Sequence, residues 1–361
     1  MISAIETFYM KKTYCPGIAL LLLFFTASSQ PNEKNPDILI GKGQLPNIAA
    51  DKNGSLHVVY GTGDSILYSV SANGGESFSA PVLIAALPQL AAFAMRGPQI
   101  AITKEGPLVT ACTKQGNIFS YKKNANGKWQ QTARVNDVDT VAKEMFMALG
   151  ADGNQVFAAW LDLRNNKRNK IVGALSKDGG KTWLKNSILY ASPDSSVCEC
   201  CKPSVAVKGN HVYVMFRNWL QGNRDLYLLH SADAGKSFAA VQKLGVNSWK
   251  LNGCPMDGGG LAINDKDAAE TVWRRNNTIY SCRPGEAETA IGEGRGCTIE
   301  TVNGHNVYAW SENGQVVVLT AQGNKKTVGK GQLPALKKIS NKNIVCVWEN
   351  EHQVYAHAIS L

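Results

Sequence analysis

Several features are scarce or missing in this 361-residue chain, and each absence removes a class of protein. Only 18% of the residues are charged, and no five consecutive residues are basic, so the net charge of +10 indicates a generally basic surface instead of a nucleic-acid-binding tail. After residue 30 no apolar run approaches the roughly 18 residues of a membrane-spanning helix. His-Glu-x-x-His, phosphate-loop and dinucleotide motifs are also missing. We therefore expect no nucleic-acid partner, no stable membrane span and no cofactor.

The first residues have the pattern of a secretory signal. Lys11 and Lys12 precede an apolar run at 18–25, and the small residues 27–29 offer a cleavage site. We therefore expect residues 1–29 to be a signal peptide and residues 30–361 to be a single exported domain, periplasmic or extracellular. We expect this domain to be a monomer.

An eight-residue pattern recurs along the chain. Near-complete copies are SANGGESF (71–78), SKDGGKTW (176–183) and SADAGKSF (231–238), and KKNANGKW (122–129) is a divergent copy. The final aromatic residues are spaced by about 50 residues, a period typical of propellers. In each copy an Asp or Asn side chain bonds the backbone of a tight turn, glycine relieves steric crowding, and the aromatic residue anchors the turn.

Short strands that end in an aromatic residue allow the blades to be counted. Six such strands occur at 57–60, 156–160, 212–216, 271–273, 307–310 and 344–348. A seventh strand, at 108–111, lacks the aromatic residue. The last unit has only three strands, and identical hexapeptides GKGQLP occur at 41–46 and 329–334. We therefore predict an all-β propeller of seven four-stranded blades, with Asp37–Ile40 completing the last blade. Six blades is the alternative.

The octapeptide resembles the Asp-box, or bacterial neuraminidase repeat, of sialidase-like β-propellers. True sialidases have six blades and bind the sugar carboxylate through three arginines, with a tyrosine nucleophile and an aspartate as acid and base. The resemblance covers nearly the whole mature chain and implies a glycoside hydrolase of the exo-α-sialidase type. The family's Arg-Ile-Pro element has its nearest match in Arg96-Gly97-Pro98, one blade late and without isoleucine, and no tyrosine can be assigned as the nucleophile.

Charged residues in two sets of loops are the candidate site residues. The connections between second and third strands share one face of a propeller with the connections between blades. Several guanidinium groups around a channel mouth suit a carboxylate, because each offers a pair of parallel donors. The candidate substrate-binding residues are Arg96, Arg164, Arg217, Asn218, Arg224 and Asp225, and the candidate catalytic acids are Asp162 and Asp257. The alternative is that these are loop charges paired with local acids.

Eight of the nine cysteines follow the expected cleavage site, and an even number in an exported protein suggests disulfides. The candidates are Cys198, Cys200, Cys201, Cys254, Cys282 and Cys297. We expect Cys254 to lie within bonding distance of one of the three cysteines at 198–201, and Cys282 to be able to pair with Cys297. The rival is a copper or zinc thiolate site that includes Met256, although no metal is assigned.

Three elements together resemble a group of exported bacterial Asp-box proteins. They are the Cys-x-Cys-Cys segment 198–201, the Arg-Asn loop that starts at Arg217, and Gly253–Gly258. The leading hypothesis is a propeller that binds or acts on an anionic glycan or small acidic sugar. The alternatives are a non-catalytic glycan- or protein-binding propeller with structural disulfides and a copper- or zinc-handling propeller. The sequence leaves open whether the protein is an enzyme.

Overall fold

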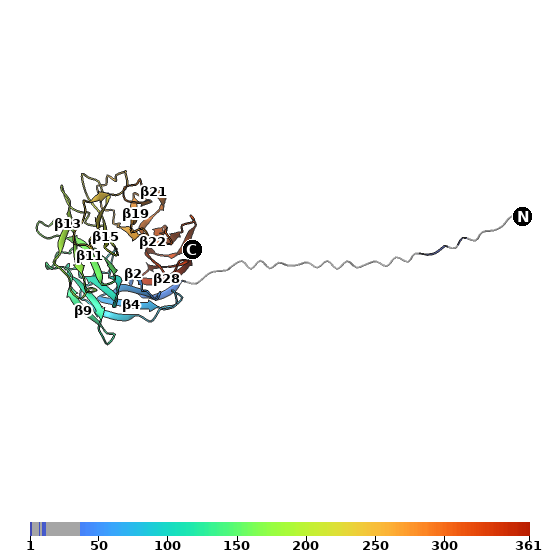
Figure 1. The fold of residues 1–361 in the computed structure, drawn as a ribbon, viewed down its shortest axis with the longest axis horizontal. Helices are drawn as coiled ribbons and strands as arrows, with labels where there is room; N and C mark the ends of the chain where they lie inside the picture. Colours follow the sequence, from blue (N-terminus) through green and yellow to red (C-terminus); the bar gives the residue numbers. More distant parts are fainter. Residues whose placement is uncertain (2–6, 8, 12–36) are drawn as a thin grey trace. The chain divides into compact units, whose positions relative to one another are not determined.

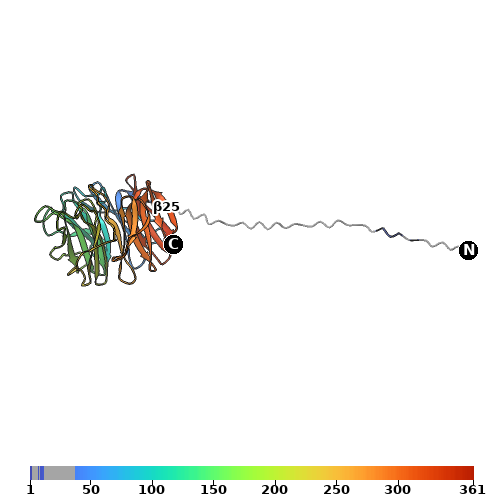
Figure 2. The ribbon, with the colours of Figure 1, turned by 90° about the horizontal axis from the view of Figure 1, so that it is seen from above.

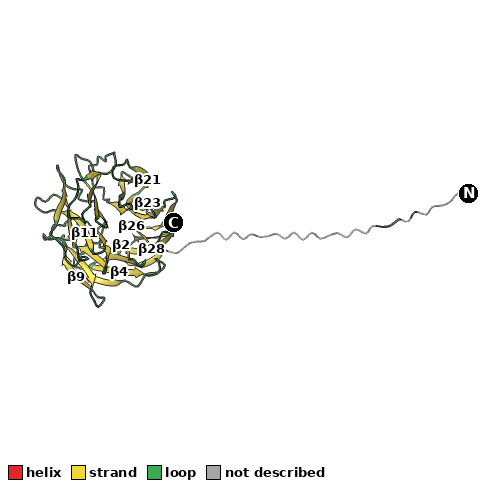
Figure 3. Ribbon diagram, in the orientation of Figure 1, coloured by secondary structure: helices red, strands yellow, loops and turns green. Residues whose placement is uncertain are grey.

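The computed structural model describes residues 1, 7, 9–11 and 37–361. Residues 37–361 contain 28 strands and no helix, and the strands form seven antiparallel sheets of four strands (Figures 1 and 3). The predicted seven-bladed all-β propeller is therefore confirmed. The expected signal peptide and the domain boundary at residue 30 lie outside the described residues. Within the described part of the chain, no helix is long and apolar enough to cross a membrane.

Each blade is numbered in chain order, from its inner to its outer strand. Blade one contains β2 (Gln44–Ala50), β3 (Leu56–Thr62), β4 (Ser65–Ser71) and β5 (Val82–Ala86). Blade two contains β6 (Gln99–Thr103), β7 (Gly106–Cys112), β8 (Ile118–Lys123) and β9 (Trp129–Arg134). Blade three contains β10 (Met147–Asp152), β11 (Gln155–Asp162), β12 (Lys170–Ser176) and β13 (Ser187–Ala191). Blade four contains β14 (Ser204–Lys208), β15 (His211–Arg217), β16 (Leu226–Ser231) and β17 (Gln242–Lys243).

The last blade is closed by the first strand of the described chain. Blade five contains β18 (Gly259–Ile263), β19 (Ala269–Arg275), β20 (Thr278–Cys282) and β21 (Thr289–Glu293). Blade six contains β22 (Arg295–Val302), β23 (His305–Glu312), β24 (Gln315–Leu319) and β25 (Lys325–Lys330). Blade seven contains β26 (Gln332–Lys338), β27 (Asn343–Asn350), β28 (Gln353–Ser360) and, outermost, β1 (Ile38–Lys42). The predicted closure is therefore confirmed, with the strand ending two residues later than expected.

The core lies between blades instead of within one. Seven apolar clusters of buried residues each join two neighbouring blades, so that the ring closes on itself. Strand β11 shows why, because successive side chains of a strand point to opposite faces of its sheet. Phe157 and Ala159 face blade four, whereas Ala158 and Trp160 face blade two. Such second strands are apolar at nearly every position because both of their faces are covered.

The repeated octapeptides form the turns between the third and fourth strands. In the third-blade copy the Ser176 hydroxyl accepts the Gly180 N–H at 2.8 Å, and the Asp178 carboxylate accepts the Thr182 N–H at 2.9 Å. The closing aromatic residues pack against the preceding blade, as Phe238 does on Phe157 at a centroid distance of 5.4 Å. These turns therefore join neighbouring blades at one end of the propeller.

The octapeptide turns and the connections between first and second strands share one face of the disc seen from the side in Figure 2. Backbone hydrogen bonds from Gly179 to Asn154 and from Ala234 to Asn210 link the two kinds of loop. The opposite face carries the connections between second and third strands and the connections between blades, which are linked by the Val197–Asn169 hydrogen bond. We call this opposite face the site face.

Candidate functional site

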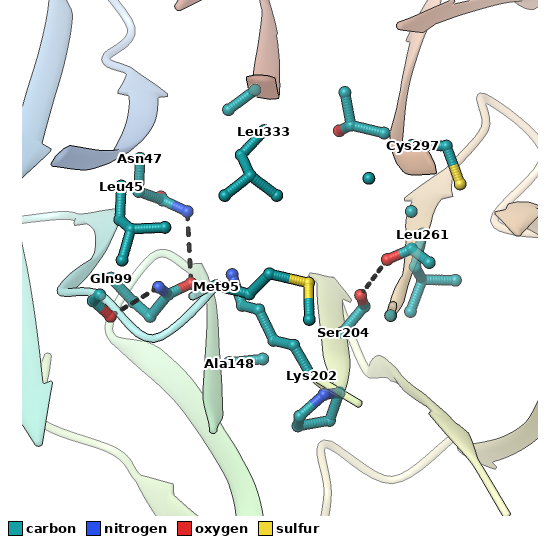
Figure 4. Close-up of a pocket in the computed structure, with 18 of the residues that line it drawn as sticks. Leu45, Asn47, Met95, Gln99, Ala148, Lys202, Ser204, Leu261, Cys297 and Leu333 are labelled. Carbon is teal, nitrogen blue, oxygen red and sulfur yellow. Dashed lines mark hydrogen bonds between the residues drawn. The ribbon is translucent and has the colours of Figure 1, made fainter. Parts of the chain in front are cut away.

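The seven inner strands surround a central channel that contains a cavity of about 230 Å³ (Figure 4). Its wall is built from the first residues of these strands and from the residues just before them, including Leu45, Asn47, Gln99 and Leu333. Among the described residues that line this cavity, Lys202 and Asp257 alone carry charge. The channel is therefore lined by both polar and apolar groups, with two opposite charges among them.

Lys202 immediately precedes Pro203 at the start of β14, and its side chain lines the channel (Figure 4). Removal of the amine from bulk water lowers the pKa of Lys202 to about 8. Within residues 37–361 this amine has no hydrogen-bond or ion-pair partner. It is therefore a channel cation free to pair with a ligand.

Asp257, a predicted catalytic acid, lies in the channel wall with 1% of its surface exposed. One carboxylate oxygen accepts hydrogen bonds from Arg274 Nε at 2.7 Å and from the Gly296 N–H at 3.2 Å. The other oxygen, Oδ1, has no partner in the described part of the chain. Asp257 is thus positioned by Arg274 but retains one unpaired acceptor.

A second cavity of about 200 Å³ adjoins the channel on the site face, and Met95 and Leu333 line both cavities. The exposed Arg295 and the buried Glu349 bring opposite charges to this mouth, and no other described residue that lines it is charged. Glu349 is already engaged, because it accepts the Leu45 N–H at 2.6 Å. Arg295 is the arginine that the channel mouth offers to a ligand.

Arg164 and Asp162 form a closed pair away from both cavities. Arg164 donates to the Asp162 carboxylate from Nε at 2.8 Å and from Nη2 at 2.9 Å, and it lies 3.2 Å from Asp137. The fully buried Asp162 also accepts the Trp160 indole N–H at 2.8 Å. This arrangement resembles a structural cross-link, and neither residue lines either cavity.

The remaining predicted binding arginines are also engaged locally. Arg217, which is 1% exposed, donates to the carbonyl oxygens of Arg224 and Arg274 at 2.7 and 2.9 Å. Arg224 donates to the Cys198 sulfur and to Glu199, both at 3.2 Å.

Three further predicted site residues are also hydrogen-bonded to other groups of the protein. Arg96 donates to the Glu144 carbonyl oxygen at 2.8 Å, and Asn218 donates to the Tyr190 hydroxyl at 2.8 Å. Asp225 accepts the Trp249 N–H at 2.7 Å. A direct contact between any of these side chains and a ligand therefore stays a prediction, and none of them lines either cavity.

A disulfide joins Cys200 to Cys254, and so links the connection before β14 to the connection before β18. The expectation that Cys254 reaches the cysteines at 198–201 is confirmed. The expected pairing of Cys282 with Cys297 is wrong, because both are free thiols on opposite faces of blade five. Cys282 packs towards blade four, whereas Cys297, in β22 of blade six, packs against the other face of blade five.

Cys198 and Cys201, also disulfide candidates, are buried free thiols in this structure. The Cys198 sulfur lies 3.1 Å from that of Cys201 and 3.7 Å from that of Cys200, and Met256 packs against the three. We call Cys198, Cys200, Cys201 and Met256 the sulfur cluster. The hydrogen bond shared with Cys201 and the positive charges of nearby arginines outweigh burial and lower the pKa of Cys198 to about 7, whereas burial raises that of Cys201.

Our sequence interpretation missed Lys202 and gave Arg295 no role. A signal for Lys202 was present, because a residue followed by proline occurs at the start of several inner strands. That residue is leucine in Leu45-Pro46 and Leu333-Pro334, but lysine in Lys202-Pro203. A charge at a position that is otherwise apolar in equivalent repeats indicates a channel-lining function.

No family model and no curated protein matches this chain. Solved structures match its fold. A catalytically inactive virginiamycin B lyase from Staphylococcus aureus, crystallised with quinupristin, has a TM-score of 0.54 at 12% identity over 90% of this chain and 98% of that one. SapL1 lectin with α-methyl fucoside has a TM-score of 0.50 at 15% identity over 81% and 98%. NanB sialidase from Streptococcus pneumoniae has a TM-score of 0.46 at 12% identity over 90% and 71%. At such identities the similarities to the lyase and the lectin show a shared fold and nothing finer.

Proposed function

We propose that this protein is an exported, sialidase-like propeller that binds an anionic sugar, free or at the end of a glycan, at the mouth of its central channel. The observation that carries the proposal is the Lys202 amine, which lines the channel without an anionic partner among residues 37–361. A charged group withdrawn from water is destabilising unless an opposite charge compensates it. A carboxylate on the ligand would supply that charge.

The size and polarity of the channel fit one sugar residue. A cavity of about 230 Å³ is smaller than the roughly 300–1,000 Å³ of pockets for drug-sized ligands, so it has room for a single ring. At the mouth, Arg295 adds a second cation, and Ser311 and Gln332 add groups that can bond sugar hydroxyls. The net charge of +10 would attract such an anion from a distance.

We favour binding over hydrolysis because the predicted acids are occupied. Asp162 is held by Arg164 and Trp160 and lines neither cavity, and Asp257 is paired with Arg274. An exo-sialidase reaction needs a free general acid and a nucleophile in one cavity. The lectin among the solved structures of similar fold is a precedent for a propeller that binds a sugar.

Export is part of the proposal. The pattern of basic, apolar and small residues at 11–29 is that of a secretory signal, and the Cys200–Cys254 disulfide suits an oxidising compartment.

Calorimetric titration with sialic acid, glucuronate and galacturonate, each against a neutral counterpart, tests the proposal. We expect at least one acidic sugar to bind at least ten times more tightly than its neutral counterpart. Lys202→Met should weaken that binding at least tenfold. The matched control is Lys208→Met, because Lys208 lies at the other end of β14, paired with Asp267 at 2.8 Å. The affinity should also fall as the pH rises through about 8, because the free amine then loses its charge.

Equal affinity for acidic and neutral sugars, or full affinity in Lys202→Met, would overturn the proposal. Turnover of a chromogenic α-sialoside by the parent protein would instead support the hydrolase alternative. That activity would have to disappear in Asp257→Asn to be assigned to this channel.

A further inference from the structure

The sulfur cluster beneath the site face has no part in sugar binding as proposed above. The three cysteine sulfurs lie within 4.8 Å of one another, which is the span of ligands around a single metal ion. Cys198 and Cys201 are buried free thiols, and the thioether side chain of Met256 packs against them. The cluster therefore offers two thiols and one thioether in a dry environment.

A negative charge on the sulfur cluster would stabilise two buried arginines next to it. Arg217 is 1% exposed, and its guanidinium has only carbonyl oxygens as hydrogen-bond acceptors within the described chain. Among the described residues, its Nε has no partner, and neither has the Nε of Arg224, which is 4% exposed. Arg224 Nη1 lies 3.2 Å from the Cys198 sulfur. Buried guanidinium groups are destabilising beside neutral thiols and are stabilised beside thiolates.

The donor set and these charges together select the metal. Thiolate and thioether sulfurs are soft ligands that prefer Cu(I), and a metal holds coordinating thiols in the thiolate form. Two thiolates and one Cu(I) carry a net charge of −1, which Arg217 compensates, since Arg224 is also paired with Glu199 at 3.2 Å. With Zn²⁺ the same set would be neutral and would leave the charge of Arg217 uncompensated, and it would lack the fourth ligand that structural zinc requires.

We propose that Cys198, Cys201 and Met256 form a binding site for one Cu(I) ion. The Cys200–Cys254 disulfide has a separate role, because it fastens the loop that carries Cys198 and Cys201 to the loop that carries Met256. The ligands are thus held together without the disulfide being broken.

The channel mouth supplies a route for the ion. Met256 lines the mouth cavity as well as packing on the cluster, and Met95 lines the same cavity. Two thioethers at the opening can pass a soft cation inward without binding it as tightly as thiolates do. The proposed route for Cu(I) therefore runs from the site face, past the two methionines, to the buried thiols.

The test is anaerobic competition for Cu(I) between the disulfide-intact protein and the colorimetric chelator bicinchoninate. We expect the protein to take one equivalent of Cu(I). Cys198→Ser and Cys201→Ser should each weaken binding at least a hundredfold, and Met256→Leu about tenfold. The matched controls are Cys112→Ser and Cys346→Ser, which replace buried free thiols remote from the cluster and should bind like the parent protein.

X-ray absorption at the copper edge of the parent protein adds a readout that needs no variant. A shell of sulfur scatterers alone supports the proposal, whereas nitrogen or oxygen ligands contradict it. Three further results would overturn the proposal. The first is a Cys198–Cys201 disulfide whose mild reduction does not give a protein that binds Cu(I). The others are full Cu(I) binding by the folded Cys198→Ser variant and Zn²⁺ binding as tight as Cu(I) binding.

Discussion

Glu288 is the anion that organises the connection between blades four and five. Its side chain is 1% exposed and pairs with Arg275, and it accepts the Val246 N–H at 2.7 Å and the Asn247 amide at 3.0 Å. Burial alone would raise the pKa of this carboxyl. The hydrogen bonds from Arg275 and Val246 outweigh burial and lower the pKa to about 2. We therefore predict that Glu288→Gln, which keeps the shape and removes the charge, destabilises the protein.

The magnitude and the pH dependence follow from the lowered pKa. A carboxyl whose pKa falls from 4.5 to about 2 on folding stabilises the native state by roughly 3 kcal/mol at neutral pH. That stabilisation is complete above pH 4.5 and is lost as the pH falls through about 2. Glu288→Gln should therefore lower the free energy of unfolding by about 2–3 kcal/mol at pH 7, and the difference from the parent should shrink steadily below pH 4.5.

Urea unfolding followed by tryptophan fluorescence at pH 7, 5 and 3 measures this difference. The control is Glu105→Gln, which breaks an exposed pair with Lys181 and should change the free energy of unfolding by less than about 1 kcal/mol. A loss below about 0.5 kcal/mol for Glu288→Gln at pH 7, or the same loss at pH 7 and pH 3, would refute the argument.

Three further predictions concern the fold. Deleting residues 37–42 removes β1 and exposes the edge of β28, so we expect aggregation in size-exclusion chromatography and a large fall in Tm; an unchanged Tm would contradict the closure. Gly180→Ala should lower Tm more than Gly153→Ala: both have positive φ, but only at 180 does the added methyl group meet another side chain, that of Leu108 at 2.5 Å. Arg217→Lys should cost about 2–3 kcal/mol in denaturant unfolding, because one ammonium cannot reach both carbonyl oxygens; parental stability would show that this fork is dispensable.

The closure of the ring was predictable because the same hexapeptide occurs at the end of β1 and at the end of blade six. The identical segments at 41–46 and 329–334 each pass from an outer strand to the next inner strand. Leu45 and Leu333 both have a positive φ, and a methyl group on either Gly43 or Gly331 would collide with the backbone and with an aromatic ring. Such a crossing restricts the residues that form it, so the same hexapeptide occurs at both places.

The candidate site was less predictable because sequence does not show which partner an arginine finds. We expected Arg164 and Arg217 to be equivalent, but Arg164 follows β11 and is neutralised by carboxylates, whereas Arg217 is the last residue of β15 and is buried against carbonyl oxygens. A sequence does not show which backbone carbonyl oxygens will accept hydrogen bonds from a side chain. The opposite limitation applies to Lys202, whose lack of a partner becomes visible only when the whole channel wall is assembled.

The pairing of β1 with β28 has a consequence for how the chain reaches its final state. Asp37 and His357 meet across this blade at a separation of 320 residues. After β1 emerges from a ribosome or an export channel, it must therefore stay unpaired until β28 has been made. Contacts between such distant residues form slowly, because the long loop must be closed first. A chain halted before residue 353 lacks β28 and has no place to dock β1, so release of a truncated product would leave an open ring with reactive sheet edges.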